Sequence, residues 1–205
     1  IGDVTNAEIA RSFGADLILL NGIDIFQPFV AGLDAKEDFI EELHRLVGRP
    51  IGINLEPVDS QAQMAGERLI IDEGRQASLA TIQRAEELGV DFICLTGNPG
   101  TGVTNQAIID TIRVVKENFS GLLIAGKMHA SGVDEPVADL EAIAQFIEAG
   151  VDIVLAPAVG SVPGFDEQDL KQIVRLAHQK GALVMSAIGT SQESADEDIV
   201  KQMAI

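Results

Sequence analysis

One short unit recurs along the chain and constrains its fold more than any other feature. The segments SFGADLILLNG, ELGVDFICLTG and EAGVDIVLAPA each contain a helix end, a glycine, a small residue, an aspartate and a short apolar run. Gly14, Gly89 and Gly150 stand where these helices end, because a residue without a Cβ adopts the left-handed conformation of a helix C-terminus without penalty. The repeat therefore predicts helices that lead through a glycine turn into buried strands.

Between these turns, apolar residues recur at helical spacing, so the whole chain alternates helix and strand. We expect strands near 15–21, 51–55, 91–96, 122–127, 151–157 and 182–188. We expect helices near 6–13, 39–48, 78–89, 105–119, 139–150 and 166–181, and a further helix from about 196. Strands that alternate with helices over short connections pair in parallel through right-handed crossovers.

Two architectures fit this order, an open doubly wound sheet and a closed (β/α)8 TIM barrel. The first helix requires a strand before it and the last a strand after it, so the six strands become eight. Side chains alternate between the two faces of a strand, and this parity in PIGINLEP also favours the barrel. One face carries branched apolar side chains, and the other carries a small residue followed by polar ones. The first set is Ile51, Ile53 and Leu55, and the second is Gly52, Asn54 and Glu56. We predict one TIM-barrel domain over 1–205, a fragment that lacks its first and eighth strands.

The charge balance narrows the classes of partner. The chain has 14 Lys and Arg against 32 Asp and Glu, a net charge of −18, which repels nucleic acid and anionic membranes. A small anionic substrate remains compatible, because local backbone N–H groups bind anions inside a negative field. The single cysteine and the absence of a membrane-length apolar run indicate a cytoplasmic protein, and association into a homo-oligomer stays open.

In a TIM barrel, the active site lies at the carboxyl ends of the strands. Several polar residues occupy those ends with the parity that we assign to the interior, and we expect them to converge on one mouth. They are Asn21, Asn54, Glu56, Thr96, Asn98, Lys127, His129 and Ser186. We predict that Asn21, Asn54, Thr96, Asn98 and Ser186 bind substrate and that Lys127, His129 and Glu56 are catalytic.

Two of the candidate catalytic residues, Lys127 and His129, lie close together in the segment IAGKMHASG. Lys127 is a candidate Schiff-base amine, base or anion clamp, and His129 a candidate acid or base near neutral pH. The structural alternative is a lysine paired with Glu56 and a histidine satisfied by the backbone. Glu56 is a candidate general base or Mg²⁺ ligand, although no second carboxylate stands at its depth, so no metal site is predicted.

Three glycine-rich loops, 97–105, 159–165 and 188–194, follow strands and are candidate anion cradles. Turn formation alone also explains such glycines. The predicted phosphate-binding residues are Gly160, Ser161, Gly189, Thr190 and Ser191. Cys94 lies in an apolar strand and is predicted to be a packed core residue.

Five motifs, DVTNAEIARSFGADLILLNG, GRPIGINLEPVD, GNPGTGVTN, GKMHASG and GALVMSAIGTSQES, resemble a family of uncharacterised bacterial TIM-barrel proteins. Its members are sometimes labelled phosphonomutase-like or haloacid-dehalogenase-like. The resemblance implies a (β/α)8 barrel whose members continue past Ile205 with an eighth strand. It implies no activity, because the sequence has neither a D-x-D nucleophile motif nor the clustered Mg²⁺-binding carboxylates and lysine-cysteine-glycine loop of the phosphoenolpyruvate mutase and isocitrate lyase group.

These residues together predict a lyase or isomerase that acts on a small anionic, phosphorylated carbonyl metabolite. The alternative is a barrel that binds or senses a ligand without converting it. A purely structural oligomer subunit is a third reading, and it predicts an apolar or collapsed mouth.

Overall fold

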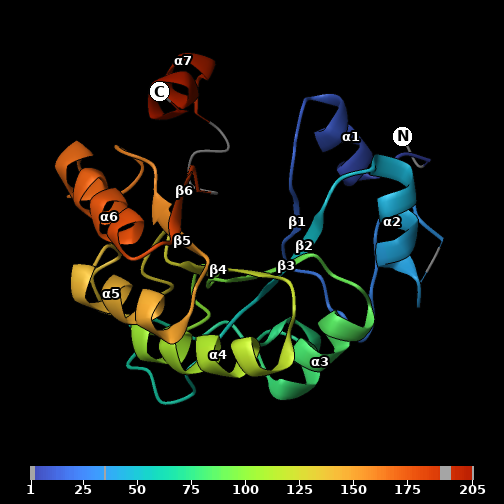
Figure 1. Ribbon diagram of the computed structural model, residues 1–205, viewed down its shortest axis with the longest axis horizontal. Helices are drawn as coiled ribbons and strands as arrows, with labels where there is room; N and C mark the ends of the chain where they lie inside the picture. Colours follow the sequence, from blue (N-terminus) through green and yellow to red (C-terminus); the bar gives the residue numbers. More distant parts are fainter. Residues whose placement is uncertain (1–2, 35, 190–194, 205) are drawn as a thin grey trace.

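The computed structural model describes residues 3–34, 36–189 and 195–204. Six parallel strands form one sheet in the order of the sequence: β1 (Ile18–Leu20), β2 (Ile51–Leu55), β3 (Phe92–Leu95), β4 (Leu122–Gly126), β5 (Ile153–Pro157) and β6 (Leu183–Ala187). The sheet curls into an arc with helices around its outer side, and β1 and β6 form its two edges (Figure 1). This is an incomplete TIM barrel, which confirms the predicted fold class.

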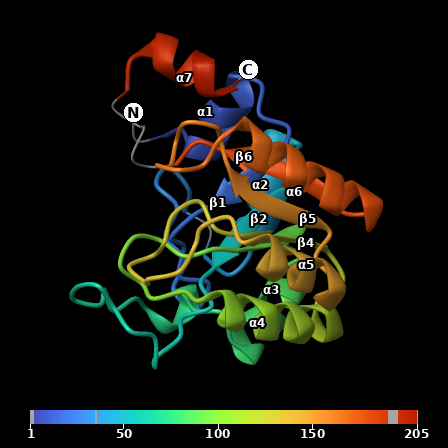
Figure 2. The same ribbon diagram turned by 90° about the vertical axis from the view of Figure 1, so that its left-hand side faces the viewer.

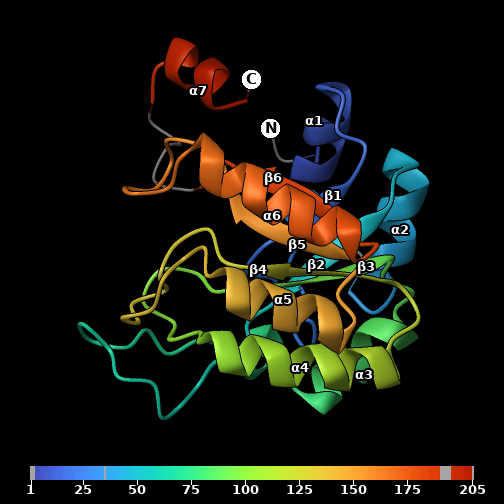
Figure 3. The ribbon, with the colours of Figure 1, turned by 60° about the vertical axis from the view of Figure 1, so that its left-hand side comes forward.

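In Figure 3, α4, α5 and α6 cover the convex side of the arc, and helices alternate with the strands along the chain. They are α1 (Asn6–Ser12), α2 (Phe39–Val47), α3 (Leu79–Glu87), α4 (Asn105–Asn118), α5 (Leu140–Ala149), α6 (Glu167–Gln179) and α7 (Glu197–Ala204), with a short 3-10 turn at Glu73–Arg75. Side-chain oxygens of Thr5, Ser78, Thr104, Asp139 and Asp166 cap five of them. None of the described helices is long and apolar enough to cross a membrane.

The aspartate of the repeated unit has a specific structural role. Asp91 accepts a hydrogen bond from the backbone N–H of Ile51 at 2.7 Å, and Asp152 accepts one from Leu123 at 2.8 Å. In each case the carboxylate at the start of one strand binds the backbone of the preceding strand. The repeat therefore encodes strand register as well as helix ends.

The two faces of the sheet carry separate apolar clusters. Ile51, Ile53 and Leu55 pack against the helices, as predicted, whereas the concave face carries Phe92 and Cys94 together with Ile124 and Leu155. The prediction that small residues fill the interior is wrong, because these interior residues are mostly large. Gly52 is the small one, since a Cβ there would stand 2.2 Å from the Phe92 ring.

The predicted parity of β4 and β6 is also wrong. Ile124 pairs with Cys94 and so faces the interior, whereas the interior parity that we assigned to Lys127 would turn Ile124 toward the helices. Ser186 pairs with Ala156, which packs on the helix side, so Ser186 points away from the mouth. Both faces of these parallel strands are covered, and their apolar runs therefore lack the alternation from which parity is read.

The connection between β2 and α3 is unusually long and lies across the neighbouring loops (Figure 2). Ala65 donates its backbone N–H to Gly132, in the loop after β4, at 2.9 Å. Leu69 likewise donates to Gly100, in the loop after β3, at 2.8 Å. These contacts tie three connections together at the carboxyl end of the sheet.

Candidate functional site

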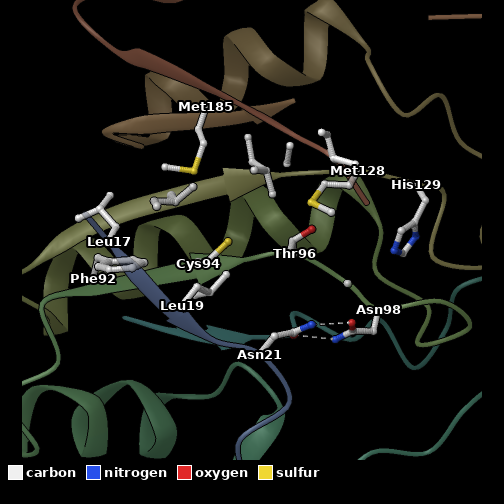
Figure 4. Close-up of a pocket in the computed structure, with 15 residues that line it drawn as sticks. Leu17, Leu19, Asn21, Phe92, Cys94, Thr96, Asn98, Met128, His129 and Met185 are labelled. Atoms are coloured by element: carbon white, nitrogen blue, oxygen red, sulfur yellow. Dashed lines mark hydrogen bonds between the residues drawn. The ribbon is translucent and has the colours of Figure 1, made fainter. Parts of the chain in front are cut away.

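A cavity of about 330 Å³ lies on the concave side of the sheet (Figure 4). Its apolar part is lined by Leu17, Leu19, Phe92, Cys94, Ile124, Leu155 and Met185, and its polar part by Asn21, Thr96, Asn98 and His129. No Asp, Glu, Lys or Arg is among the described residues that line it. The cavity thus combines an apolar interior with a neutral polar end.

Three asparagines form the centre of the polar end. The amides of Asn21 and Asn98 bind each other reciprocally, with both N–O distances at 3.2 Å, as Figure 4 shows. The side-chain N–H of Asn54 donates to the side-chain amide oxygen of Asn21 at 3.0 Å. The side-chain oxygen of Asn54 accepts a hydrogen bond from the backbone N–H of Thr96 at 3.3 Å. The ends of β1, β2 and β3 are therefore joined by side-chain amides, and these predicted residues do come together.

Glu56 lies behind these amides and is 1% exposed. Its Oε2 accepts the backbone N–H of Asn98 at 2.7 Å, and its Oε1 accepts the Asn98 side-chain amide at 2.8 Å. Arg75 donates Nη2 to the same Oε1 at 3.0 Å. The Lys127–Glu56 pair that we considered does not form: Glu56 pairs with Arg75, and its carboxylate orients Asn98 from behind.

His129 lines the cavity on the loop after β4. Its Nδ1 accepts the backbone N–H of Ser131 at 3.1 Å, which places the proton of the neutral ring on Nε2. Burial lowers the pKa of His129 below its ordinary value; the Glu56 carboxylate opposes this shift, and the Lys127 ammonium reinforces it. The ring is therefore neutral at pH 7 and presents an N–H donor.

This environment predicts how His129 titrates. Because the folded pKa is lowered, the unfolded chain takes up the proton first as the pH falls below about 6.5. The contribution of His129 to the free energy of unfolding should be complete above that value and decrease below it. NMR titration of the imidazole C–H signals should give His129 a pKa below the ordinary histidine value of about 6.5. An equal or higher pKa for His129 would contradict the assigned tautomer and burial.

Lys127 does not line the cavity. It is 2% exposed, and its Nζ lies 2.6 Å from Oε2 of Glu135, which also accepts the backbone N–H of Asn105 at 2.8 Å. The Glu135 carboxylate therefore ties the loop after β4 to the first turn of α4, and the Lys127 ammonium neutralises it. The expected convergence of Lys127 with the other residues at the mouth is wrong, because β4 has the opposite parity.

The structure describes three of the five predicted phosphate-binding residues, Gly160, Ser161 and Gly189. Ser161 donates both its backbone N–H and its hydroxyl to the carbonyl of Ala158, at 3.1 and 2.6 Å, and Gly160 turns with φ +81°. None of Gly160, Ser161 or Gly189 lines the cavity. Thr190 and Ser191 lie outside the described residues. Ser186 lines a separate hollow beside α6.

The described residues do not fit a Mg²⁺ site. Glu56 already binds a guanidinium and two amide donors, and no group of three or more His, Cys, Asp or Glu side chains gathers in the described part of the chain. Cys94 is buried, which raises the pKa of its thiol to about 12. A neutral thiol is a packing group and a poor nucleophile.

Two residues of the site escaped the sequence analysis, Arg75 and Ser131. Arg75 lies in the connection after β2, and every such connection reaches the carboxyl end of the sheet. A search for basic residues in the connections after strands would have found it. Ser131 adopts φ +54°, a conformation that depends on its surroundings and that its residue type does not signal.

Solved structures share the fold at low sequence identity. 2,3-Dimethylmalate lyase, of the PEP mutase/isocitrate lyase superfamily, is 12% identical, with a TM-score of 0.57 over 97% of this chain and 69% of that chain. Phosphonopyruvate hydrolase with oxalate and Mg²⁺ is 13% identical, with a TM-score of 0.50 over 97% and 77%. The 3-keto-L-gulonate-6-phosphate decarboxylase of Vibrio cholerae is 13% identical, with a TM-score of 0.53 over 88% and 69%.

These likenesses show a shared TIM-barrel fold and give no support to a haloacid-dehalogenase fold. The sequence matches no curated protein. One family model, a domain of unknown function (DUF7916), matches residues 1–205, and the chain therefore belongs to that family.

Proposed function

We propose that this protein is a lyase or isomerase that forms an enolate from a small anionic carbonyl compound. The observation that carries the proposal is the neutral His129, whose Nδ1 is occupied by Ser131 and whose ring lines the cavity beside the asparagine cluster. Nε2 makes no hydrogen bond to a described residue. It is free to donate to a substrate oxygen.

The chemistry follows from the tautomer. When a bond on the carbon next to a carbonyl group breaks, its electron pair forms the C=C bond of the enolate and the C=O π pair moves onto the oxygen, which becomes negative. A proton that departs in this step passes to solvent water. A fixed N–H donor stabilises this charge more than the starting carbonyl. His129 would act as the donor to that oxygen and not as a base, since the basic nitrogen of the neutral ring is already occupied.

The apolar part of the cavity supports the same chemistry. Phe92, Ile124, Leu155 and Met185 exclude water from one side of the site, which strengthens hydrogen bonds to the developing charge. Lys127 has no covalent role in this proposal, because Glu135 holds its amine as an ion pair outside the cavity lining. The activities after which the lyase, hydrolase and decarboxylase with the same fold are named are compatible with this reaction class.

Exchange of substrate α-protons with D2O tests enolate formation directly. The full chain should catalyse such exchange, or cleavage, for a member of a panel of 2-oxo acids and sugar phosphates followed by NMR. His129→Leu removes the donor and should slow the reaction by about 10²–10³-fold. His129→Gln keeps an N–H at similar reach and should retain more activity.

His178→Gln is the matched control, since His178 lies exposed on α6, and it should leave the rate unchanged. Binding of panel compounds without exchange or turnover would instead support the ligand-sensing alternative. Equal rates for wild type and His129→Leu would refute the assigned role.

A further inference from the structure

Ser131, on the loop after β4, combines two unfavourable features. Within the described part of the chain it is the one residue other than glycine with a positive φ, at +54°, and it is 2% exposed. Its hydroxyl is buried and makes no hydrogen bond to a described residue. A residue with both a strained backbone and an unpaired buried hydroxyl keeps its place only where its surroundings hold it there.

Two hydrogen bonds and one close approach hold Ser131 in this position. Its backbone N–H donates to Nδ1 of His129 at 3.1 Å, and its carbonyl oxygen accepts the backbone N–H of Gly102, in the loop after β3, at 3.0 Å. A Cβ on Gly97 would stand 2.5 Å from the Ser131 Oγ and 2.7 Å from Cγ2 of Val103. The loop after β4 therefore fits against the end of β3 because residue 97 has no side chain.

This fit decides which nitrogen of His129 carries the proton. Gly97 and His129 both line the cavity, whereas Ser131 stays outside the lining. As long as the Ser131 N–H occupies Nδ1, the proton of the neutral ring stays on Nε2. A loop displaced from β3 would withdraw this N–H, and the neutral ring would then carry its proton on either nitrogen.

We propose that Ser131 is the positioning residue of His129 and that Gly97 provides the space that this role requires. The backbone N–H of Ser131, and not its hydroxyl, fixes the ring in the Nε2–H form. The inference rests on the proposed function, because His129 is the donor assigned to that site. It adds that contact between the loops after β3 and β4 sets the donor, through a residue outside the cavity lining.

Long-range ¹H–¹⁵N NMR spectra of the histidine rings test this role, because they distinguish a protonated ring nitrogen from a bare one. The signals that are lost in His129→Gln identify His129. In the full chain above pH 7, His129 should show only the Nε2–H form. Ser131→Ala removes the hydroxyl alone, and Ser131→Gly also relieves the backbone strain. Both variants keep the backbone N–H, so both should give the wild-type ring spectrum.

Two further variants should displace the loop. Ser131→Thr keeps the hydroxyl but branches at Cβ, which disfavours a positive φ, and Gly97→Ala places a methyl group against the Ser131 Oγ. In both, the Nδ1–H form of His129 should appear beside the Nε2–H form. The pKa of His129 should rise, because the donor that favours the neutral ring is lost. With an active substrate, kcat should fall by up to about 10²-fold and KM should change far less.

Gly66→Ala is the matched control for Gly97→Ala, since nothing lies within 4 Å of a Cβ at Gly66, and its ring spectrum should match wild type. Thermal melts show which variants are folded. The proposal is overturned if wild type shows both ring forms, if folded Ser131→Thr or Gly97→Ala keeps the single Nε2–H form, or if Ser131→Ala loses it. The spectra need no substrate, so the expected ring form without any proton exchange would refute the proposed function alone.

Discussion

Replacing Glu56 with alanine is expected to lower the free energy of unfolding by about 3–5 kcal/mol, the cost of breaking a buried ion pair from one side. The change removes the acceptor of three hydrogen bonds, from Arg75 and from two N–H groups of Asn98. Arg75 then keeps a partly buried charge without a partner. Urea unfolding followed by circular dichroism measures the loss.

Glu87→Ala is a matched control for this prediction. Glu87 also pairs with an arginine, Arg84, at 3.2 Å, but its side chain is 67% exposed. Exposed pairs contribute about 0–1 kcal/mol, so this variant should unfold almost as wild type does. If both variants lost the same free energy of unfolding, burial would not explain how much the Glu56–Arg75 pair stabilises the fold.

Replacing Gly126 with alanine is expected to destabilise the fold by about 3 kcal/mol or more, at or beyond the upper end of the usual cost of overpacking. A Cβ at this position would stand 2.0 Å from the carbonyl oxygen of Leu155, and that atom belongs to the backbone of β5. The clash can be relieved only if β4 and β5 move apart. Lys127 and His129 follow on the same segment, so the site should lose order as well.

Gly66→Ala provides the comparison, since nothing lies within 4 Å of a Cβ at that position. Thermal unfolding and the imidazole signals of His129 should both change for Gly126→Ala and stay constant for Gly66→Ala. A wild-type melting temperature for Gly126→Ala would mean that the two strands accommodate a methyl group without cost.

The fold was predictable because local signals agreed with one another. The glycine turns, the helical spacing and the apolar runs locate every described strand to within a few residues. The face of the sheet to which each side chain points was predictable at β2 and β3, where Asn54 and Cys94 contrast with branched neighbours. It failed at β4 and β6, where apolar residues occupy both faces and only pairing with the next strand decides the direction of each side chain.

The candidate site was predictable where it depends on strand ends alone. Asn21, Asn54 and Asn98 meet because parallel neighbours end at one edge. Glu56 pairs with Arg75 and Lys127 pairs with Glu135, and both partners lie in the connections between strands and α-helices. No periodic pattern governs such segments, so their contacts follow from the path of the folded chain.

The aspartates that bind neighbouring strands lie at the end of the sheet opposite the candidate site. Asp91 and Asp152 bind the backbone N–H groups of Ile51 and Leu123 at the amino ends of the strands, and they also pair with His44 on α2 and Lys116 on α4. Strand alignment is therefore independent of which side chains stand at the opposite, carboxyl ends. The register of β2–β3 and of β4–β5 is thus held from the amino ends of these strands, at a distance from residues such as Thr96 at the carboxyl ends.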